Sequence, residues 1–122
     1  MRKKPTYPPE DKIALYDQLV ASHPDIVRKG KTSPYTSVNG HMFSYLSKTG
    51  TAAIRLPKTE REAFLEKYDT TLDEQYGAVM KEYVQVPDHL LQDIDALKPY
   101  LTLSFEYVKS LKPKPTKRKK KT

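Results

Sequence analysis

The strongest structural constraint in this sequence is the stretch VNGHMFSYLSKTGTAAIRLP, residues 38–57. Asn39-Gly40 is typical of a type I′ hairpin turn, because both central residues of that turn need a positive φ angle. Two apolar runs follow, Met42–Leu46 and Ala52–Leu56, and the segment Ser47–Gly50 between them has the composition of a second turn. The stretch therefore predicts a meander of three short antiparallel strands, at about 35–38, 41–47 and 52–56.

Side-chain alternation along the second of these strands predicts which residues share a face. Successive residues of a strand point to opposite sides of the sheet, so Met42, Ser44 and Leu46 are expected on one side. Phe43 and Tyr45 are then expected on the other side. Because apolar side chains fall on both sides, we expect this strand to be central rather than at an edge.

The rest of the chain predicts three helices and one more strand. Apolar spacing and helix-start signals mark helices at about 9–21, 60–68 and 93–111. The segment Thr59–Glu62 has the pattern of a capping box, and Pro99 predicts a kink or a restart in the last helix. Residues 80–86 alternate as a strand does, whereas 69–79 are expected to form a loop with a turn at Gly77.

These elements together predict an α+β fold of two layers. The expected sheet is antiparallel with about four strands, the meander plus one, and the N-terminal, middle and C-terminal helices pack on it. With 122 residues, the chain is long enough for one domain with a real core. We expect a disordered N-terminus at 1–8, a single domain at 9–111 and a disordered basic tail at 112–122.

Charge is strongly segregated along the chain. There are 22 Lys and Arg residues against 15 Asp and Glu residues, a net charge of +7. Ten of the cations lie within residues 1–4 and 112–122, which contain no acid, so residues 5–111 carry a net charge of −3. The positive charge that would attract a polyanion therefore belongs to the two ends.

Several kinds of site are excluded or unsupported by the sequence. The absence of cysteine rules out disulfides, thiolate zinc sites and cysteine nucleophiles. The three histidines, His23, His41 and His89, lack the spacing of a zinc site. Gly30–Thr32 matches the end of a phosphate-binding P-loop, but Asp25 stands where that motif needs glycine. The sequence predicts no catalytic residue, no metal and no cofactor, and hence a protein that is not an enzyme.

Two groups of residues are candidates for contact with a ligand or a partner. The first is a pocket between the sheet and the helices, expected around His41, Tyr45 and Tyr83. The second is an aromatic stripe on the last helix beside its core-facing stripe, formed by Tyr100, Leu103 and Tyr107. That stripe fits either burial within one chain or the interface of a homodimer or other partner.

The tail is the segment with a direct physical argument for a polyanionic partner. Its cations would neutralise phosphates and release counterions, which gives salt-sensitive and sequence-independent affinity for nucleic acid. The alternatives are contact with another anionic surface or with ribosomal RNA, a nuclear address, which the run KRKKK fits in composition, and a solvating role without a dedicated target. The cations concerned are Lys112, Lys114, Lys117, Arg118, Lys119, Lys120 and Lys121.

The order and content of the elements resemble the TfoX N-terminal domain family, which is related in fold to the YjbR-like proteins. The matching pieces are the glycine turn with Met42-Phe43, the strand ending in Arg55-Leu56, the aromatic strand that runs into Val86-Pro87, and the closing helix LKPYLTLSFEYVKSL. The arginine–methionine–phenylalanine–glycine–glycine opening common in those domains is replaced here by GKTSPYTSV. The resemblance implies a two-layer α/β fold and a regulatory domain with no catalytic residue to carry over.

Three hypotheses for function follow. The first is a small non-enzymatic binding or regulatory module of the TfoX-like kind, with weak nucleic-acid contact through its tail. The second is a small-ligand-binding protein or an enzyme that uses the predicted pocket. The third is a structural subunit, either homo-oligomeric or bound to a partner. A chain without cysteine, without a secretory signal and without a long apolar run is expected in the cytoplasm rather than in a membrane.

Overall fold

A computed structural model of the chain describes residues 9–30, 34–75 and 77–111. The predicted N-terminus at 1–8 and the predicted basic tail at 112–122 lie outside these described residues. The elements, in chain order, are α1 (Glu10–Ala21), β1 (Tyr35–Val38), β2 (His41–Leu46), β3 (Ala52–Arg55), α2 (Lys58–Lys67), β4 (Leu72–Gln75), β5 (Ala78–Val86), α3 (Asp88–Leu91) and α4 (Ile94–Lys109).

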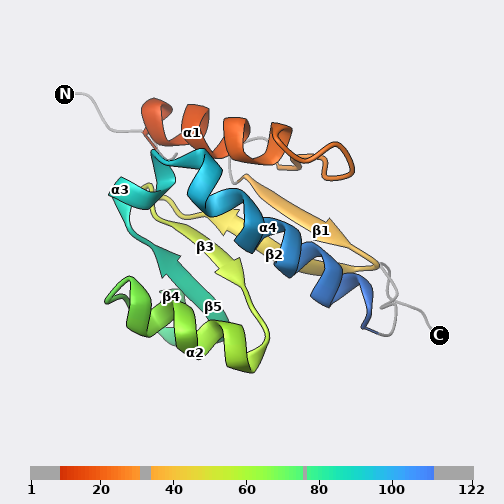
Figure 1. Ribbon diagram of the computed structural model, residues 1–122. Coiled ribbons are helices and arrows are strands. Elements are labelled where there is room, and N and C mark those ends of the chain that lie inside the picture. The colour runs from red at the N-terminus through yellow and green to blue at the C-terminus, as the bar shows by residue number, and fades with distance from the viewer. Residues whose placement is uncertain (1–8, 31–33, 76, 112–122) are drawn as a thin grey trace.

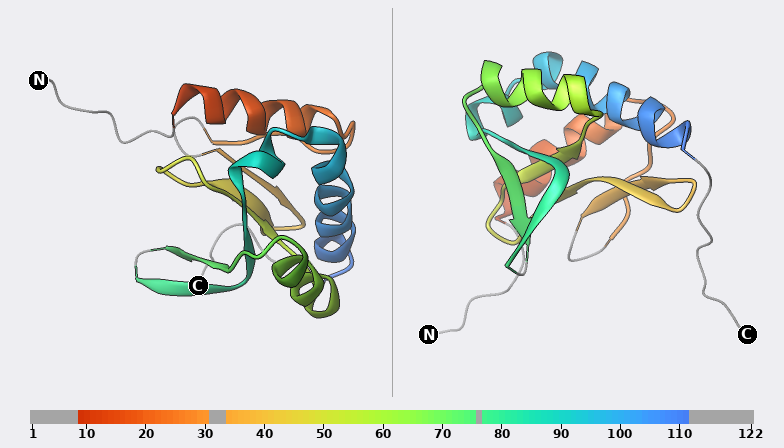
Figure 2. Two further views of the ribbon diagram at one scale, coloured as in Figure 1. Left: turned by 60° about the vertical axis from the view of Figure 1, so that its left-hand side comes forward. Right: turned by 90° about the horizontal axis from the view of Figure 1, so that it is seen from below.

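Within the described residues, five strands form one antiparallel sheet in the order β1-β2-β3-β5-β4. The helices α1, α2 and α4 lie on one side of this sheet, which we call the helix face (Figures 1 and 2). The predicted α+β fold of two layers is therefore confirmed. The sheet has one strand more than expected, because β4 forms within the segment 69–79 that was predicted to be a loop.

The main core fills the space between the helices and the sheet. Tyr16 of α1 is fully buried there, and its hydroxyl is hydrogen-bonded to the hydroxyl of Ser44 on β2 at 2.7 Å. Ser44 is bonded in turn to the hydroxyl of Thr36 on β1, so the buried polar groups of this layer have partners. The largest fully buried side chains of this core include Phe43, Ile54, Phe64, Leu91, Leu97 and Leu101.

A β-bulge at Phe43 changes which side chains of β2 share a face. Across β1 and β2, Thr36 lies opposite Ser44 and Ser37 lies opposite Met42, so Phe43 has no opposite residue. The extra residue turns both Phe43 and Ser44 toward the helix face, where Phe43 is fully buried. Met42 packs with Tyr45 on the other side. The prediction from strict alternation was therefore wrong for Met42 and Phe43.

Two of the helices differ in detail from the prediction. Helix α2 begins at Lys58, directly after Pro57, so Thr59 lies inside the helix and the predicted capping box does not form. Pro57 is the N-cap, with an extended ψ of 162°, and the helix begins at the residue after it. Helix α4 runs as one helix through Pro99 rather than restarting there, and Asp93 caps it by accepting a hydrogen bond from the Ala96 amide.

Candidate functional site

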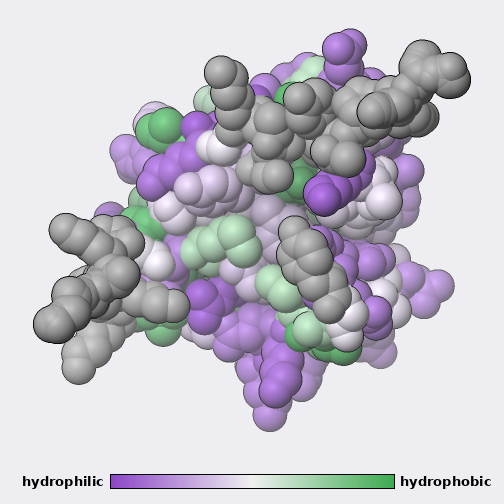
Figure 3. All heavy atoms as spheres, turned by 180° about the vertical axis from the view of Figure 1, so that it is seen from behind, coloured by the Kyte–Doolittle hydropathy of each residue, from purple (hydrophilic) through white to green (hydrophobic). Residues whose placement is uncertain are grey.

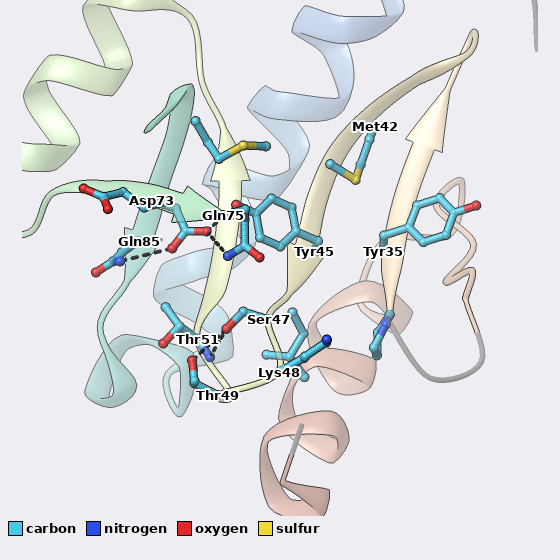
Figure 4. A pocket seen from close by; sticks show the side chains of 14 residues that line it. Tyr35, Met42, Tyr45, Ser47, Lys48, Thr49, Thr51, Asp73, Gln75 and Gln85 are labelled. Atoms are coloured by element: carbon cyan, nitrogen blue, oxygen red, sulfur yellow. Dashed lines mark hydrogen bonds between the residues drawn. The ribbon is translucent and has the colours of Figure 1, made fainter. Parts of the chain in front are cut away.

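A cleft of about 580 Å³ lies on the side of the sheet opposite the helices, which we call the cleft face. Figure 3 shows the molecule from this side, where small apolar patches are set among more polar residues. Residues of β1, β2, β4 and β5 line the cleft together with the turn between β2 and β3 (Figure 4). The cleft is thus formed by residues far apart in the sequence that the sheet brings together.

One wall of the cleft is apolar and aromatic. It consists of Tyr35 from β1, Met42 and Tyr45 from β2, and Met80 from β5. The bulge described above puts Met42 on this face, beside Tyr45. A flat or aliphatic group of a ligand could be desolvated against this wall.

Tyr45 is held in place by the neighbouring strands. Its ring packs against the ring of Tyr83 on β5, with centroids 5.2 Å apart and planes tilted by 44°. The Tyr83 hydroxyl donates a hydrogen bond of 2.7 Å to the backbone carbonyl of Met42. Ala53, the residue of β3 directly opposite Tyr45, is fully buried, and its small side chain leaves room for both rings.

The buried carboxylate of Asp73 forms the polar end of the cleft. Asp73 comes from the edge strand β4 and is only 3% exposed. It accepts hydrogen bonds from the Tyr45 hydroxyl, from Gln75 Nε2 at 2.8 Å and from Gln85 Nε2 at 3.0 Å. Figure 4 shows the two glutamine side chains reaching this carboxylate from different strands. Tyr45, Ala53 and Gln85 form one row across β2, β3 and β5, so the carboxylate bridges the two ends of that row.

All three donors to Asp73 are uncharged. The ion pairs of the described residues are Lys12–Asp88, Arg28–Asp17 and Arg55–Glu82, and none involves Asp73. Lys48 and Glu74 also line the cleft, and both are exposed. The described lining therefore carries two carboxylates and one ammonium group.

The two buried tyrosines of this site, Tyr45 and Tyr83, are neutral near neutral pH. Burial, followed by the hydrogen bond to Asp73, raises the pKa of Tyr45 well above its ordinary value. Burial raises the pKa of Tyr83 to about 12. A protonated phenol donates a hydrogen bond but does not act as a base or a nucleophile. Tyr45 therefore orients the Asp73 carboxylate through its hydrogen bond.

The pocket residues predicted from the sequence are only partly brought together. Tyr45 lines the cleft, and Tyr83 supports it from β5. His41 lies opposite Val38 beside the hairpin turn and is not part of the lining. The sequence places the pocket between the sheet and the helices, whereas the cleft lies on the opposite face of the sheet.

The predicted interface residues of α4 pack against the main core and lie on the helix face. The ring of Tyr100 meets Phe64 edge-on with centroids 4.9 Å apart. Tyr107 lies under the Arg55 guanidinium, and its hydroxyl donates to the Glu82 carboxylate at 3.4 Å. Leu103 also packs against the core. These contacts account for their partial burial within one chain, while a contact with a second copy stays a prediction. The predicted cations of the tail lie outside the described residues.

The polar half of the cleft was missed by sequence reasoning. Asp73 and Gln75 fall in the segment that was predicted to be a loop, so their side chains had no expected face. The available signal was Gly77, whose φ of +79° marks the turn of the β4–β5 hairpin. With a turn there, Leu72–Gln75 becomes a candidate partner for the strand that follows.

Other observations bear on what the site could bind. The described residues contain no group of three or more histidine, cysteine or acidic side chains that could hold a metal ion. The helices within the described ranges all fall short of the length and apolarity needed to cross a membrane.

Comparison of the chain with family models, curated proteins and solved structures found no match.

Proposed function

We propose that this domain is a small, non-enzymatic ligand-binding module of the TfoX-like kind, and that its ligand site is the cleft. One observation carries the proposal: the buried carboxylate of Asp73 forms one end of a cleft that has an aromatic wall. Three side chains, one each from β2, β4 and β5, donate hydrogen bonds to this carboxylate and hold it in place. Small-molecule sites are typically 300–1,000 Å³ in volume and combine apolar walls with a few fixed polar groups. The cleft agrees with both features.

A binding role is favoured over a catalytic one by the state of the polar groups. The Asp73 carboxylate is engaged by three donors, and the raised pKa of Tyr45 keeps its phenol protonated near neutral pH. The three hydrogen bonds fix the position of the carboxylate, which suits it to the recognition of a ligand, and the protonated phenol of Tyr45 donates a hydrogen bond but cannot accept a proton as a general base does. The cysteine-free sequence fits a reducing cytoplasm, where we propose that the module works.

A fragment screen with a blocked cleft tests this proposal. A chemically broad set of neutral, acidic and basic fragments is screened by saturation-transfer NMR against the wild type and two tryptophan variants. Thr51→Trp adds a bulky ring to the cleft lining, and Thr59→Trp adds the same ring to an exposed position of α2. We expect fragments that bind the wild type and Thr59→Trp but lose at least about tenfold in affinity for Thr51→Trp.

The proposal fails if no fragment binds, or if the fragments that bind do so equally to both variants. Thermal melting of both variants shows whether each has folded. If Thr51→Trp does not fold, Thr49→Trp in the exposed turn of the same lining replaces it.

A second candidate function, contact with a polyanion through the tail, is favoured by the segregation of charge. Seven cations and no acid in residues 112–122 contrast with the net charge of −3 in residues 5–111. We propose weak, sequence-independent contact with nucleic acid. If all seven cations neutralised phosphates of duplex DNA, the logarithm of the affinity would fall with the logarithm of the salt concentration with a slope of about −6, and fewer contacts would give a shallower slope.

Truncation after Leu111 tests the role of the tail. Affinity for a random oligonucleotide and retention on heparin are measured for the full chain and the truncated chain. We expect the truncated chain to lose most of both, with its thermal melting unchanged. Equal retention of the two chains would end this candidate and leave the cleft proposal untouched.

A further inference from the structure

We propose that the ligand of the cleft is a small organic cation, with an ammonium group at Asp73 and an apolar or aromatic body against Tyr35 and Met42. This inference rests on the proposed function, since it names the chemical class of the ligand for the same site.

Among the residues that the structure describes, the buried carboxylate of Asp73 has no countercharge. Asp73 is 3% exposed, and no described lysine, arginine or histidine forms an ion pair with it. Burying a carboxylate is costly unless it is paired and hydrogen-bonded. Its three neutral donors, Tyr45, Gln75 and Gln85, offset only part of that cost. A ligand cation would supply the missing countercharge.

The carboxylate has acceptor capacity left for such a ligand. A carboxylate offers about four lone-pair sites on its two oxygens. Oδ2 accepts from Tyr45 and Gln75, whereas Oδ1 accepts from Gln85 alone. One acceptor position on Oδ1 therefore remains for an N–H donor of the ligand.

The rest of the lining favours a cation over an anion. The second carboxylate of the lining, Glu74, adds to the negative charge, and Lys48 is the one ammonium group of the described lining. Lys48 is exposed in the turn after β2, so its charge is screened by water. The faces of Tyr35 and Tyr45 attract cations through their ring electrons, and the thioethers of Met42 and Met80 pack well against apolar groups.

Three probes with the same ring and different charge test the inference: 2-phenylethylamine, 2-phenylethanol and phenylacetate. Calorimetry or NMR titration measures the affinity of each for the wild type. A hydrogen bond to a charged group is stronger than one between neutral groups, so we expect the amine to bind at least about tenfold more tightly than the alcohol. Phenylacetate is expected to bind most weakly, because it places a second carboxylate beside Asp73.

Two variants at the polar end locate the effect. Asp73→Asn removes the charge and keeps an acceptor for Tyr45, while the Gln85 amide can turn to face the new donor. We expect the affinity of Asp73→Asn for the amine to fall to the level of its affinity for the alcohol. Gln75→Lys places an ammonium group of the chain itself beside Asp73, and we expect it to abolish amine binding without loss of thermal stability. Gln92→Lys adds the same charge at an exposed position after α3 and serves as the control.

The outcomes separate this inference from the proposed function. Equal affinity for all three probes, or undiminished amine binding by folded Gln75→Lys, overturns the cation inference and leaves a cleft that binds ligands of another class. Failure of all three probes to bind the wild type also overturns it. In that case the broader fragment screen still decides whether the cleft binds small molecules.

Discussion

At the scale of single residues, Gly50 is the point where the turn after β2 packs against the start of α1. Its φ is +90°, and a Cβ atom built on it would lie 2.9 Å from Lys12 Cγ and 3.0 Å from Pro9 Cδ. Lys12 is itself held by an ion pair with Asp88 at 3.1 Å, and the proline ring is rigid. Any larger residue at position 50 would therefore meet both backbone strain and a close contact.

The first prediction compares this glycine with Gly77. Gly77 also has a positive φ, of +79°, but a Cβ atom there would meet nothing within 4 Å. We expect Gly77→Ala to lower the free energy of unfolding by about 1 kcal/mol through strain alone, and Gly50→Ala to lower it by about 2 kcal/mol or more. Urea denaturation measures both. Equal losses would mean that α1 does not pack against this turn.

Buried phenols predict how stability depends on pH. Burial raises the pKa of Tyr83 to about 12 and raises those of Tyr16 and Tyr45 further, while an unfolded tyrosine titrates near 10. Above pH 10 the unfolded chain loses protons that the folded chain keeps. The free energy of unfolding therefore falls as pH rises from about 10, by about 1.4 kcal/mol per pH unit for Tyr83 up to pH 12.

Tyr83→Phe checks this second prediction. The variant loses its hydrogen bond to the Met42 carbonyl, which costs about 1 kcal/mol at neutral pH. Between pH 10 and 12 its stability should fall less steeply than that of the wild type, by about the amount assigned to Tyr83. Parallel curves for the two proteins would show that Tyr83 is not buried as described.

At the scale of elements, the bulge in β2 decides what each side chain of that strand does. Phe43 is fully buried on the helix face, whereas Met42 is half-buried and lines the cleft. The third prediction is that Phe43→Ala lowers the free energy of unfolding by about 3–5 kcal/mol, and Met42→Ala by less than about 2 kcal/mol. Chemical denaturation of the two variants gives the comparison. A larger loss of stability for Met42→Ala than for Phe43→Ala would contradict the bulge. It would indicate that the side chains of β2 alternate strictly and that Met42 does not line the cleft.

The elements that the sequence predicts well are those with strong local signals. The meander follows from Asn39-Gly40 and from the turn ending at Gly50, and the helices follow from their apolar spacing. β4 was missed because LDEQ has neither apolar alternation nor β-branched residues, and it becomes a strand only by pairing with β5. Since Asp73 lies on β4, the polar half of the cleft was lost with it.

The bulge was missed for a different reason. A bulge is defined by the register between two paired strands, since two residues of one strand lie opposite one residue of the other. The sequence of β2 alone therefore does not reveal the bulge. The sequence thus predicts a two-layer α+β domain, while the cleft follows from one irregular register and one polar edge strand.

At the scale of the whole molecule, the two faces of the sheet differ in kind. The helix face carries the large apolar core, with Phe43, Ile54 and Val84 under the helices. The cleft face carries a smaller cluster around Tyr45, Ala53 and Tyr83, which supports the floor of the cleft. Stability is expected to depend mainly on the first face, and recognition on the second.

The methionine methyl groups offer the most direct test of recognition at the cleft face. The sequence contains three methionines, and two of them, Met42 and Met80, line the cleft from different strands. With methyl-¹³C methionine, each gives one NMR signal, which Met42→Leu and Met80→Leu assign. We predict that every fragment whose binding is blocked by Thr51→Trp shifts both cleft signals together and in proportion to saturation. Saturating binding that leaves both signals unmoved would contradict the account.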